Sequence, residues 1–98
     1  MGYQSGFLTG DLATLALGSL TLSPTFDPEV YAYTTSSTNA TDSLTATPVD
    51  TGASVTTKLN GTTFTGSTIT WTVSTDTLEI IVDAGNGVTK TYTVTCTH

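Results

Sequence analysis

Two prolines interrupt the segment from Leu20 to Tyr33 and restrict what it can fold into. Pro24 and Pro28 each lack a backbone donor and push the preceding residue toward extended geometry, so no helix can run through this segment. The segment therefore predicts a corner between two strands, one at residues 20–22 and one at residues 30–35.

Apolar residues alternate with hydroxyl residues along the rest of the chain, which is the pattern of strands with one buried face. The strongest turn signal is Asn60-Gly61, because both central positions of a type I′ turn favour positive φ. Pro48 should end a strand or mark an edge strand, because it cannot donate to a ladder. We expect these inward-facing residues: Leu44, Ala46, Val55, Thr57, Leu59, Ile69, Trp71, Val73, Leu78, Ile80, Val82, Tyr92, Val94 and Cys96.

The segment from Leu20 to Tyr33 resembles the start of cadherin-like β-sandwich domains of bacterial surface proteins and phage structural proteins, with the pattern Leu-x-Leu-Ser, Pro-x-Phe-Asp-Pro and Val-x-x-Tyr. Near the end, Leu-x-Ile-x-Val, a Gly-containing turn and Thr-x-Thr-Tyr-Thr-Val-Thr are similar too. The resemblance covers residues 15–97 and departs at residues 74–77, where the family commonly has Gly-x-Asn. It implies an all-β fold: an immunoglobulin-like or cadherin-like antiparallel β-sandwich of about seven strands.

Residues 1–14 differ from the rest and lie ahead of the resemblance. Gly2, Gly6 and Gly10 break any regular period there. We expect an extended N-terminal arm over residues 1–14 and the sandwich over residues 15–98. The arm supplies four apolar side chains as candidate partner-docking residues, namely Tyr3, Phe7, Leu8 and Leu12. A loosely packed tail is the alternative.

A short helix is a further expectation at the end of the arm. Asp11 could cap a single helical turn over residues 12–17, with Gly18 ending it. So short a helix would need tertiary support, because isolated helices of this length are marginal in water.

The charge balance excludes several classes of partner. The formal net charge is −6, only two residues are Lys or Arg, and about a quarter of the chain is threonine. Nucleic-acid binders need clustered cations, so we expect no nucleic-acid partner. The sequence contains neither a run of apolar residues long enough for a membrane span nor a secretory signal, so we expect neither membrane insertion nor export by the chain itself.

No group of residues indicates catalysis, a cofactor or a metal site. His98 is terminal and expected to be frayed, and Cys96 shares inward parity with Tyr92 and Val94, where a thiol acts as a small apolar group. The acidic residues fall mainly at expected turns and strand ends, where Asp binds local backbone donors. The sequence contains no Asp-x-Asp run of the kind that would indicate calcium binding. Trp71 is most simply a core residue, with a ligand-stacking platform as the alternative.

Two functions remain as hypotheses. The first is a non-enzymatic structural module made in the host cytoplasm and attached to a bacteriophage virion as an accessory or decoration protein. Its arm would dock on capsid or tail subunits, and edge pairing could also form a homo-oligomer. The second is an adhesion or carbohydrate-binding repeat of a bacterial cell-surface protein, with its ligand surface on loops at residues 36–42 or 84–87.

Overall fold

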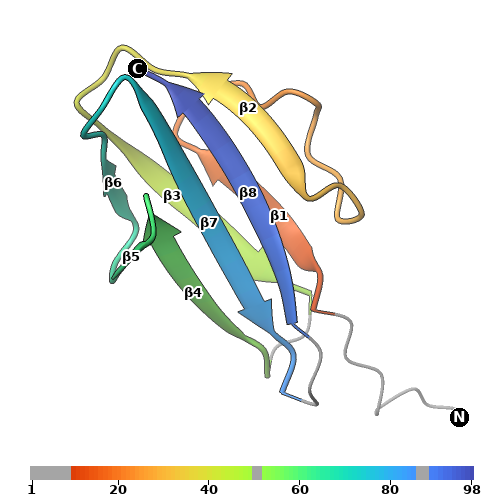
Figure 1. The fold of residues 1–98 in the computed structure, drawn as a ribbon. Helices are drawn as coiled ribbons and strands as arrows, with labels where there is room; N and C mark the ends of the chain where they lie inside the picture. The colour runs from red at the N-terminus through yellow and green to blue at the C-terminus, as the bar shows by residue number, and fades with distance from the viewer. Residues whose placement is uncertain (1–9, 50–51, 86–88) are drawn as a thin grey trace, which may run out of the picture.

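The fold consists of two packed sheets, as expected for a β-sandwich. The computed structural model describes residues 10–49, 52–85 and 89–98, and these residues form eight strands (Figure 1). The three-stranded sheet has the order β1-β3-β6, with β1 at Leu12–Leu17, β3 at Thr41–Pro48 and β6 at Thr68–Thr70. The five-stranded sheet has the order β2-β8-β7-β4-β5, with β2 at Ala32–Ser36, β4 at Ser54–Leu59, β5 at Thr62–Phe64, β7 at Thr75–Asp83 and β8 at Thr89–Thr97.

The core lies between the inner faces of the two sheets. The two long central strands supply the six residues that the alternation predicted, and each has 0% exposure: Leu78, Ile80, Val82, Tyr92, Val94 and Cys96. The three-stranded sheet contributes Leu12, Leu15, Leu17, Leu44 and Ile69. Strict period-two burial on β7 and β8 explains why the sequence identified this half of the core so well.

Val73 is an exception among the expected inward residues. It is 52% exposed, so its placement in the core was wrong. The backbone N–H groups of Thr72 and Val73 both donate to the Asp76 carboxylate, at 3.2 and 3.4 Å. The chain therefore curls into a turn after Trp71, and the alternation of β6 does not continue.

The expected helical turn at residues 12–17 is wrong, because these residues form β1 and pair with β3. The register shifts between Leu12 and Thr14, which makes Ala13 the extra residue of a β-bulge. The bulge puts Leu12 and Leu15 on the same buried face although they are three residues apart, a spacing that also fits a helix. The sandwich thus begins no later than Leu12, and this part of the expected arm belongs to the core.

The segment between β1 and β2 closes one side of the sandwich. The expected strand at residues 20–22 is reduced to a single bridge between Ser23 and Thr34. The Tyr33 hydroxyl donates to the Asp27 carbonyl (2.7 Å) and accepts from its N–H (2.9 Å). The Tyr92 hydroxyl donates to the Pro28 carbonyl (2.6 Å). The segment is thus tied to two strands of the large sheet.

Strand pairing on this side departs from the antiparallel expectation, since β2 runs parallel to β8. An ion pair between Lys90 and Asp11 (2.7 Å) joins β8 to the residue that precedes β1. The hydrogen bond that Lys90 donates to Asp11 raises the pKa of the lysine well above its usual value of 10.5. Both sheets are therefore linked where β1 begins.

The Asn60-Gly61 turn gives a first testable prediction. Both residues have positive φ, 52° and 85°, which confirms the hairpin that the sequence indicated. Substitution Gly61→Ala should lower the free energy of unfolding by about 1–2 kcal/mol, because alanine is strained in this conformation. Urea denaturation followed by tryptophan fluorescence measures the effect.

The matched control for this substitution is Gly52→Ala. An added Cβ meets nothing within 4 Å at either glycine, and Gly52 does not have positive φ. The control should change stability by no more than about 0.5 kcal/mol, or raise it slightly by restricting the unfolded chain. Equal losses at the two positions would contradict the strain argument.

Candidate functional site

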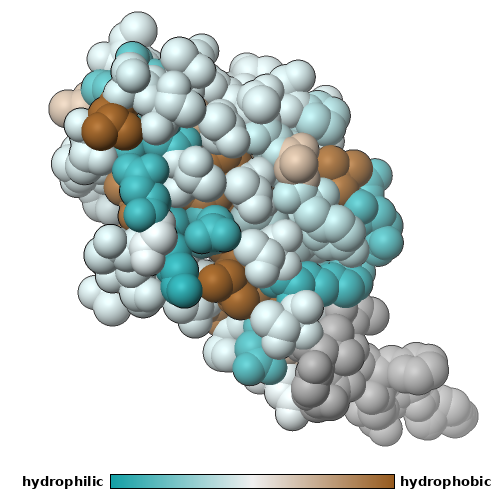
Figure 2. All heavy atoms as spheres, viewed as in Figure 1, coloured by the Kyte–Doolittle hydropathy of each residue, from teal (hydrophilic) through white to brown (hydrophobic). Residues whose placement is uncertain are grey.

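The side of the sandwich opposite the tyrosine-tied segment is open. It lies where β4 and β5 of one sheet face β3 and β6 of the other (Figure 1). We call it the open side and define it by two hollows that share Phe64 and Thr65. Elsewhere, the face seen in Figure 2 is mostly pale, as expected for hydroxyl residues, with separate apolar patches.

The open side exists because β5 and β6 are only three residues long. After Phe64 the chain crosses from the large sheet to the small one through residues 65–67. Gly66 has φ of +89°, a conformation that glycine adopts without strain and that allows this sharp crossing. The strand that reaches the small sheet is therefore too short to cover the whole edge of β3.

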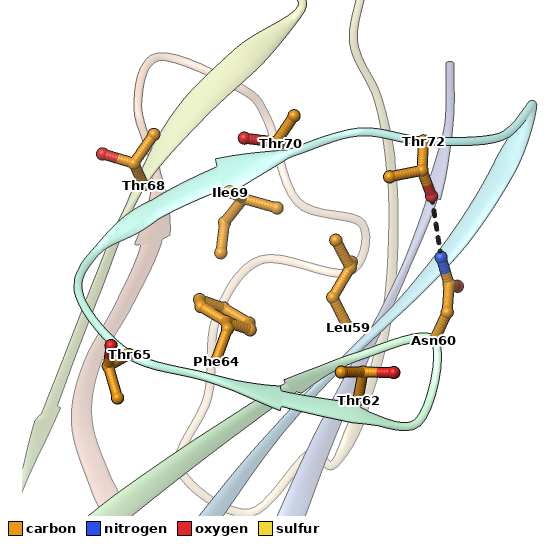
Figure 3. A pocket seen from close by; sticks show the side chains of 9 residues that line it. All are labelled: Leu59, Asn60, Thr62, Phe64, Thr65, Thr68, Ile69, Thr70 and Thr72. Atoms are coloured by element: carbon orange, nitrogen blue, oxygen red, sulfur yellow. Dashed lines mark hydrogen bonds between the residues drawn. The ribbon is translucent and has the colours of Figure 1, made fainter.

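The first hollow lies inside the loop formed by β5, the crossing and β6, and has a volume of about 410 Å³. Leu59, Phe64 and Ile69 point into it, and threonines form its rim (Figure 3). The Asn60 side-chain amide donates to the Thr72 hydroxyl (3.2 Å) across one end (Figure 3). This hollow has an apolar floor and a rim of hydroxyl groups.

The second hollow lies on the other side of the crossing and has a volume of about 440 Å³. Its apolar lining comes from Leu44 and Ala46 on β3, Val55 on β4 and Phe64 on β5. Of these four, Ala46, Val55 and Phe64 are only partly buried. Apolar side chains that would be covered in a closed sandwich are thus accessible here.

One stretch of β3 has an unpaired backbone edge in this second hollow. The Leu44 N–H donates to the Ser67 carbonyl (2.6 Å), and the Ser43 carbonyl accepts from the Gly18 N–H (2.7 Å). The direction of the backbone N–H and C=O groups alternates along an antiparallel strand. On β3, the backbone groups of even-numbered residues therefore point toward β6, and those of odd-numbered residues point toward β1. β6 pairs only with Thr41–Ser43, so the N–H and C=O groups of Ala46 face the open side, and no strand of the described residues lies beside them.

Pro48 has a more specific position than the sequence indicated. β3 ends at Pro48, which confirms the expectation that this proline ends a strand or marks an edge, although β3 is the central strand of its sheet. Pro48 pairs with Leu12 of β1. Its backbone nitrogen faces the open side, as the backbone groups of the other even-numbered residues of β3 do. Because proline has no backbone N–H, the unpaired edge of β3 has no hydrogen-bond donor at Pro48.

A buried carboxylate fixes the position of β6. Asp42, only 8% exposed, accepts hydrogen bonds from Ser37 Oγ (2.6 Å), Asn39 Nδ2 (2.9 Å) and Trp71 Nε1 (2.7 Å). Burial raises the pKa of Asp42, but the hydrogen bonds from Ser37, Trp71 and Asn39 outweigh it and hold the pKa below its usual 3.8. Trp71 is a core residue, as expected, and its indole N–H also has a polar partner.

Asp76 forms a second buried network next to the first hollow. It has 0% exposure and accepts from Asn60 Nδ2 (2.6 Å) and the Thr72 hydroxyl (3.0 Å). Burial raises the pKa of Asp76, but hydrogen bonds from Asn60, Thr72 and the Val73 N–H together lower it below 3.8. The sequence assigned the acidic residues mainly to turns and strand ends and gave no indication that these two are buried. Only the inward parity of Asp76 with Leu78 and Ile80 could have revealed its burial.

The structure places the other candidate residues as follows. Leu12 is fully buried, so its expected role as a partner-docking residue is wrong. Tyr3, Phe7 and Leu8 lie outside the described residues. His98 is held instead of frayed, since its N–H donates to the Ser74 carbonyl (2.8 Å) and its Nε2 donates to the Asn39 carbonyl (2.6 Å).

The thiol and the acidic residues show no arrangement for chemistry in the described part of the chain. Cys96 is fully buried, and burial raises the pKa of its thiol above the usual 9.0. No group of three or more His, Cys, Asp or Glu side chains within residues 10–49, 52–85 and 89–98 could hold a metal ion. Over the same residues, no helix is long and apolar enough to cross a membrane.

Comparison with protein families identifies the fold. The family model for the cadherin-like beta sandwich domain matches residues 17–98, so the chain belongs to this family. A search of curated proteins found no match. The matched region includes both long central strands and the open side, whereas most of β1 precedes it. The family is a non-catalytic one, and its fold is typical of interaction modules.

The Asp76 network gives a second prediction. Substitution Asp76→Asn should lower the free energy of unfolding by about 1.5–3 kcal/mol at neutral pH, because a charged acceptor with several donors is lost. The folded-state pKa of Asp76 lies below 3.8, so its contribution is present above that pH and is lost as the pH falls through the folded value. The difference between variant and wild type should therefore shrink below about pH 4.

Urea denaturation over a series of pH values between about 2.5 and 7 measures this effect. Glu29→Gln is the control, since Glu29 is exposed and its substitution at neutral pH should change the free energy of unfolding by no more than about 0.5 kcal/mol. A deficit of the Asp76 variant that stayed constant down to the lowest pH would contradict the charge argument.

Proposed function

We propose that this cadherin-like sandwich is a structural module that attaches to a larger protein assembly, specifically a bacteriophage virion, as an accessory or decoration protein. The observation that carries the proposal is the open side, where two apolar hollows lie beside an unpaired stretch of β3. Unpaired strand edges and apolar hollows are the features by which sheet proteins bind extended segments of partners. The partners are capsid or tail subunits.

The course of the chain supports a projecting module. β1 begins at the end of the sandwich where β3 ends, as the pairing of Leu12 with Pro48 shows. β8 finishes at the opposite end, where the His98 N–H reaches Ser74 (Figure 1). A module that is entered at one end and left at the other can be held at one end while its long faces remain in solvent.

The surface chemistry supports a protein partner. The net charge of −6 disfavours contact with phosphate-rich polymers. Threonine on solvent-facing strand positions keeps strand propensity without charge. The open side itself is lined by apolar and hydroxyl residues, so a partner segment of neutral or basic character meets little repulsion there.

Fractionation of a lysed source culture tests this function. Sedimented particles, cell envelopes and the soluble fraction are compared by quantitative mass spectrometry. We expect peptides of this chain to be enriched in particles at a fixed ratio to a major particle protein, because a virion component is incorporated stoichiometrically. Their presence only in the envelope, within a much longer protein, would contradict the virion assignment and support the alternative below.

The second candidate function is carbohydrate binding by a bacterial surface protein. A third hollow of about 460 Å³ at the end where β8 finishes favours it, because hydroxyl, amide and imidazole groups suit a saccharide. The lining comprises Ser19, Leu20, Ser36, Ser37, Thr38, Asn39, Thr97 and His98. The other loop considered, at residues 84–87, lies partly outside the described residues.

A glycan panel tests the carbohydrate function. If the third hollow binds a saccharide, binding should fall at least about tenfold in Thr38→Arg, because the exposed Thr38 lines the hollow and a long charged side chain would fill it. Thr25→Arg adds the same charge at an exposed position away from the hollow and should leave binding unchanged. Absence of binding across the panel, or equal loss in both variants, would contradict this function.

A further inference from the structure

We propose that residues 1–9 of one copy bind as an added strand along the unpaired edge of β3 in a second copy, with apolar side chains in the second hollow. This inference goes beyond attachment to an assembly, because it makes a second copy of the chain, and not a capsid or tail subunit, the occupant of the second hollow. It applies to the isolated protein in solution, so it can be tested without knowing which particle carries the protein.

The acceptor is defined by the pairing that β6 leaves incomplete. Continuing the β3–β6 register would place Thr65 opposite Ala46, but Phe64 pairs with Thr57 in the other sheet and the chain crosses over. The N–H and C=O groups of Ala46 and the C=O group of Pro48 therefore point to a position with space for another strand. That strand would extend the small sheet where β6 stops.

The second hollow sets the side-chain requirement for the added strand. Ala46, Val55 and Phe64 line it and are partly exposed. A strand on this edge would direct alternate side chains into the hollow and the others to solvent beside the exposed Thr45 and Thr47. The occupant should therefore be extended, apolar on one face and free of acidic side chains, because the protein as a whole carries a net charge of −6.

Residues 1–9 have this composition. In an extended chain Tyr3, Ser5 and Phe7 share one face, and Gln4, Gly6 and Leu8 share the other. Tyr3 and Phe7 would be about 13 Å apart along a strand, so both rings would lie on the face that turns toward the second hollow. The segment has no charged side chain, and Gly6 can lie close to another backbone.

The geometry of β1 favours a second copy over the same chain. β1 already occupies the other edge of β3, and the Asp11 carbonyl accepts from the Val49 N–H (2.9 Å) just beyond the end of β3. To reach its own open side, the chain would have to cross over the end of β3 and reverse direction. Phe7 is three residues from Gly10, about 10 Å of extended chain, and this length would be used in the crossing.

Single-cysteine proteins test the proposal in the full-length chain. In a Cys96→Ala background, a Gly6→Cys protein is mixed with a Thr47→Cys protein that carries a distinguishing mass label. Thr47 is exposed and lies next to Ala46 on β3, so its side chain would meet the solvent-facing side of the added strand. Mild oxidation should give the mixed disulfide dimer at least about fivefold more often than Gly6→Cys mixed with Thr91→Cys, a control on exposed β8 residue 91.

A protein that carries both Gly6→Cys and Thr47→Cys distinguishes binding of the segment to a second copy from binding to its own chain. At low concentration it should remain without an internal disulfide and form disulfide-linked dimers as the concentration rises. An internal disulfide formed at all concentrations would overturn the proposal by placing the segment on its own chain. A yield of mixed disulfide dimer with Thr47→Cys that is no higher than with Thr91→Cys would also overturn the proposal, because it would show that the segment does not lie beside β3.

Sedimentation equilibrium provides an independent measurement without engineered cysteines. We expect the wild-type chain to self-associate and Phe7→Asp to weaken the association at least about tenfold, because a carboxylate would enter an apolar hollow. Gln4→Asp adds the same charge on the opposite face of the segment, which would point to solvent, and should weaken the association less than about threefold. Equal association of wild type and Phe7→Asp would overturn the proposal, whereas the particle fractionation tests the virion function separately.

Discussion

The Asp42 carboxylate is the interaction on which the arrangement of the small sheet depends. It accepts hydrogen bonds from the side chains of Ser37, Asn39 and Trp71. Ser37 and Asn39 lie in the loop before β3, and Trp71 is the residue after β6. The Trp71 N–H also donates to the Ala40 carbonyl (3.1 Å), so the tryptophan is fixed to this loop through both its backbone and its indole. A buried carboxylate without its donors would be costly, so the three segments must assemble together.

Fixing Trp71 against the start of β3 determines how far β6 can run. β6, which ends just before Trp71, pairs only with Thr41–Ser43 of β3. The crossing around Gly66 connects the start of β6 to β5 in the other sheet, so β6 cannot extend further along β3. On the opposite side, Tyr33 and Tyr92 tie the long segment before β2 to the large sheet. The sandwich is therefore closed by hydrogen bonds on one side and open on the other, and this asymmetry distinguishes its possible binding surfaces.

The sequence predicted the elements whose burial follows a simple period and missed those set by tertiary contacts. Leu78, Ile80 and Val82 alternate strictly and were assigned correctly, as was the Asn60-Gly61 turn. The bulge at Ala13 changed the spacing of β1 and imitated a helix. The binding surface depends on where β6 ends and on which half of β3 it leaves unpaired. No local pattern contains this information, because it follows from register between residues far apart in the sequence.

An unpaired edge is a hazard as well as a binding surface, and the position of Pro48 addresses this. Along β3, only Ala46 offers both an N–H and a C=O to the open side, while Pro48 offers a carbonyl alone and β6 covers the edge from Ser43 backward. The edge therefore accepts a short strand but cannot start a long ladder, which is how edge strands avoid general aggregation. Affinity must then come mainly from side chains entering the hollow formed by Ala46, Val55 and Phe64. Selectivity follows, because an acidic or bulky polar segment would lose those contacts while gaining few backbone hydrogen bonds.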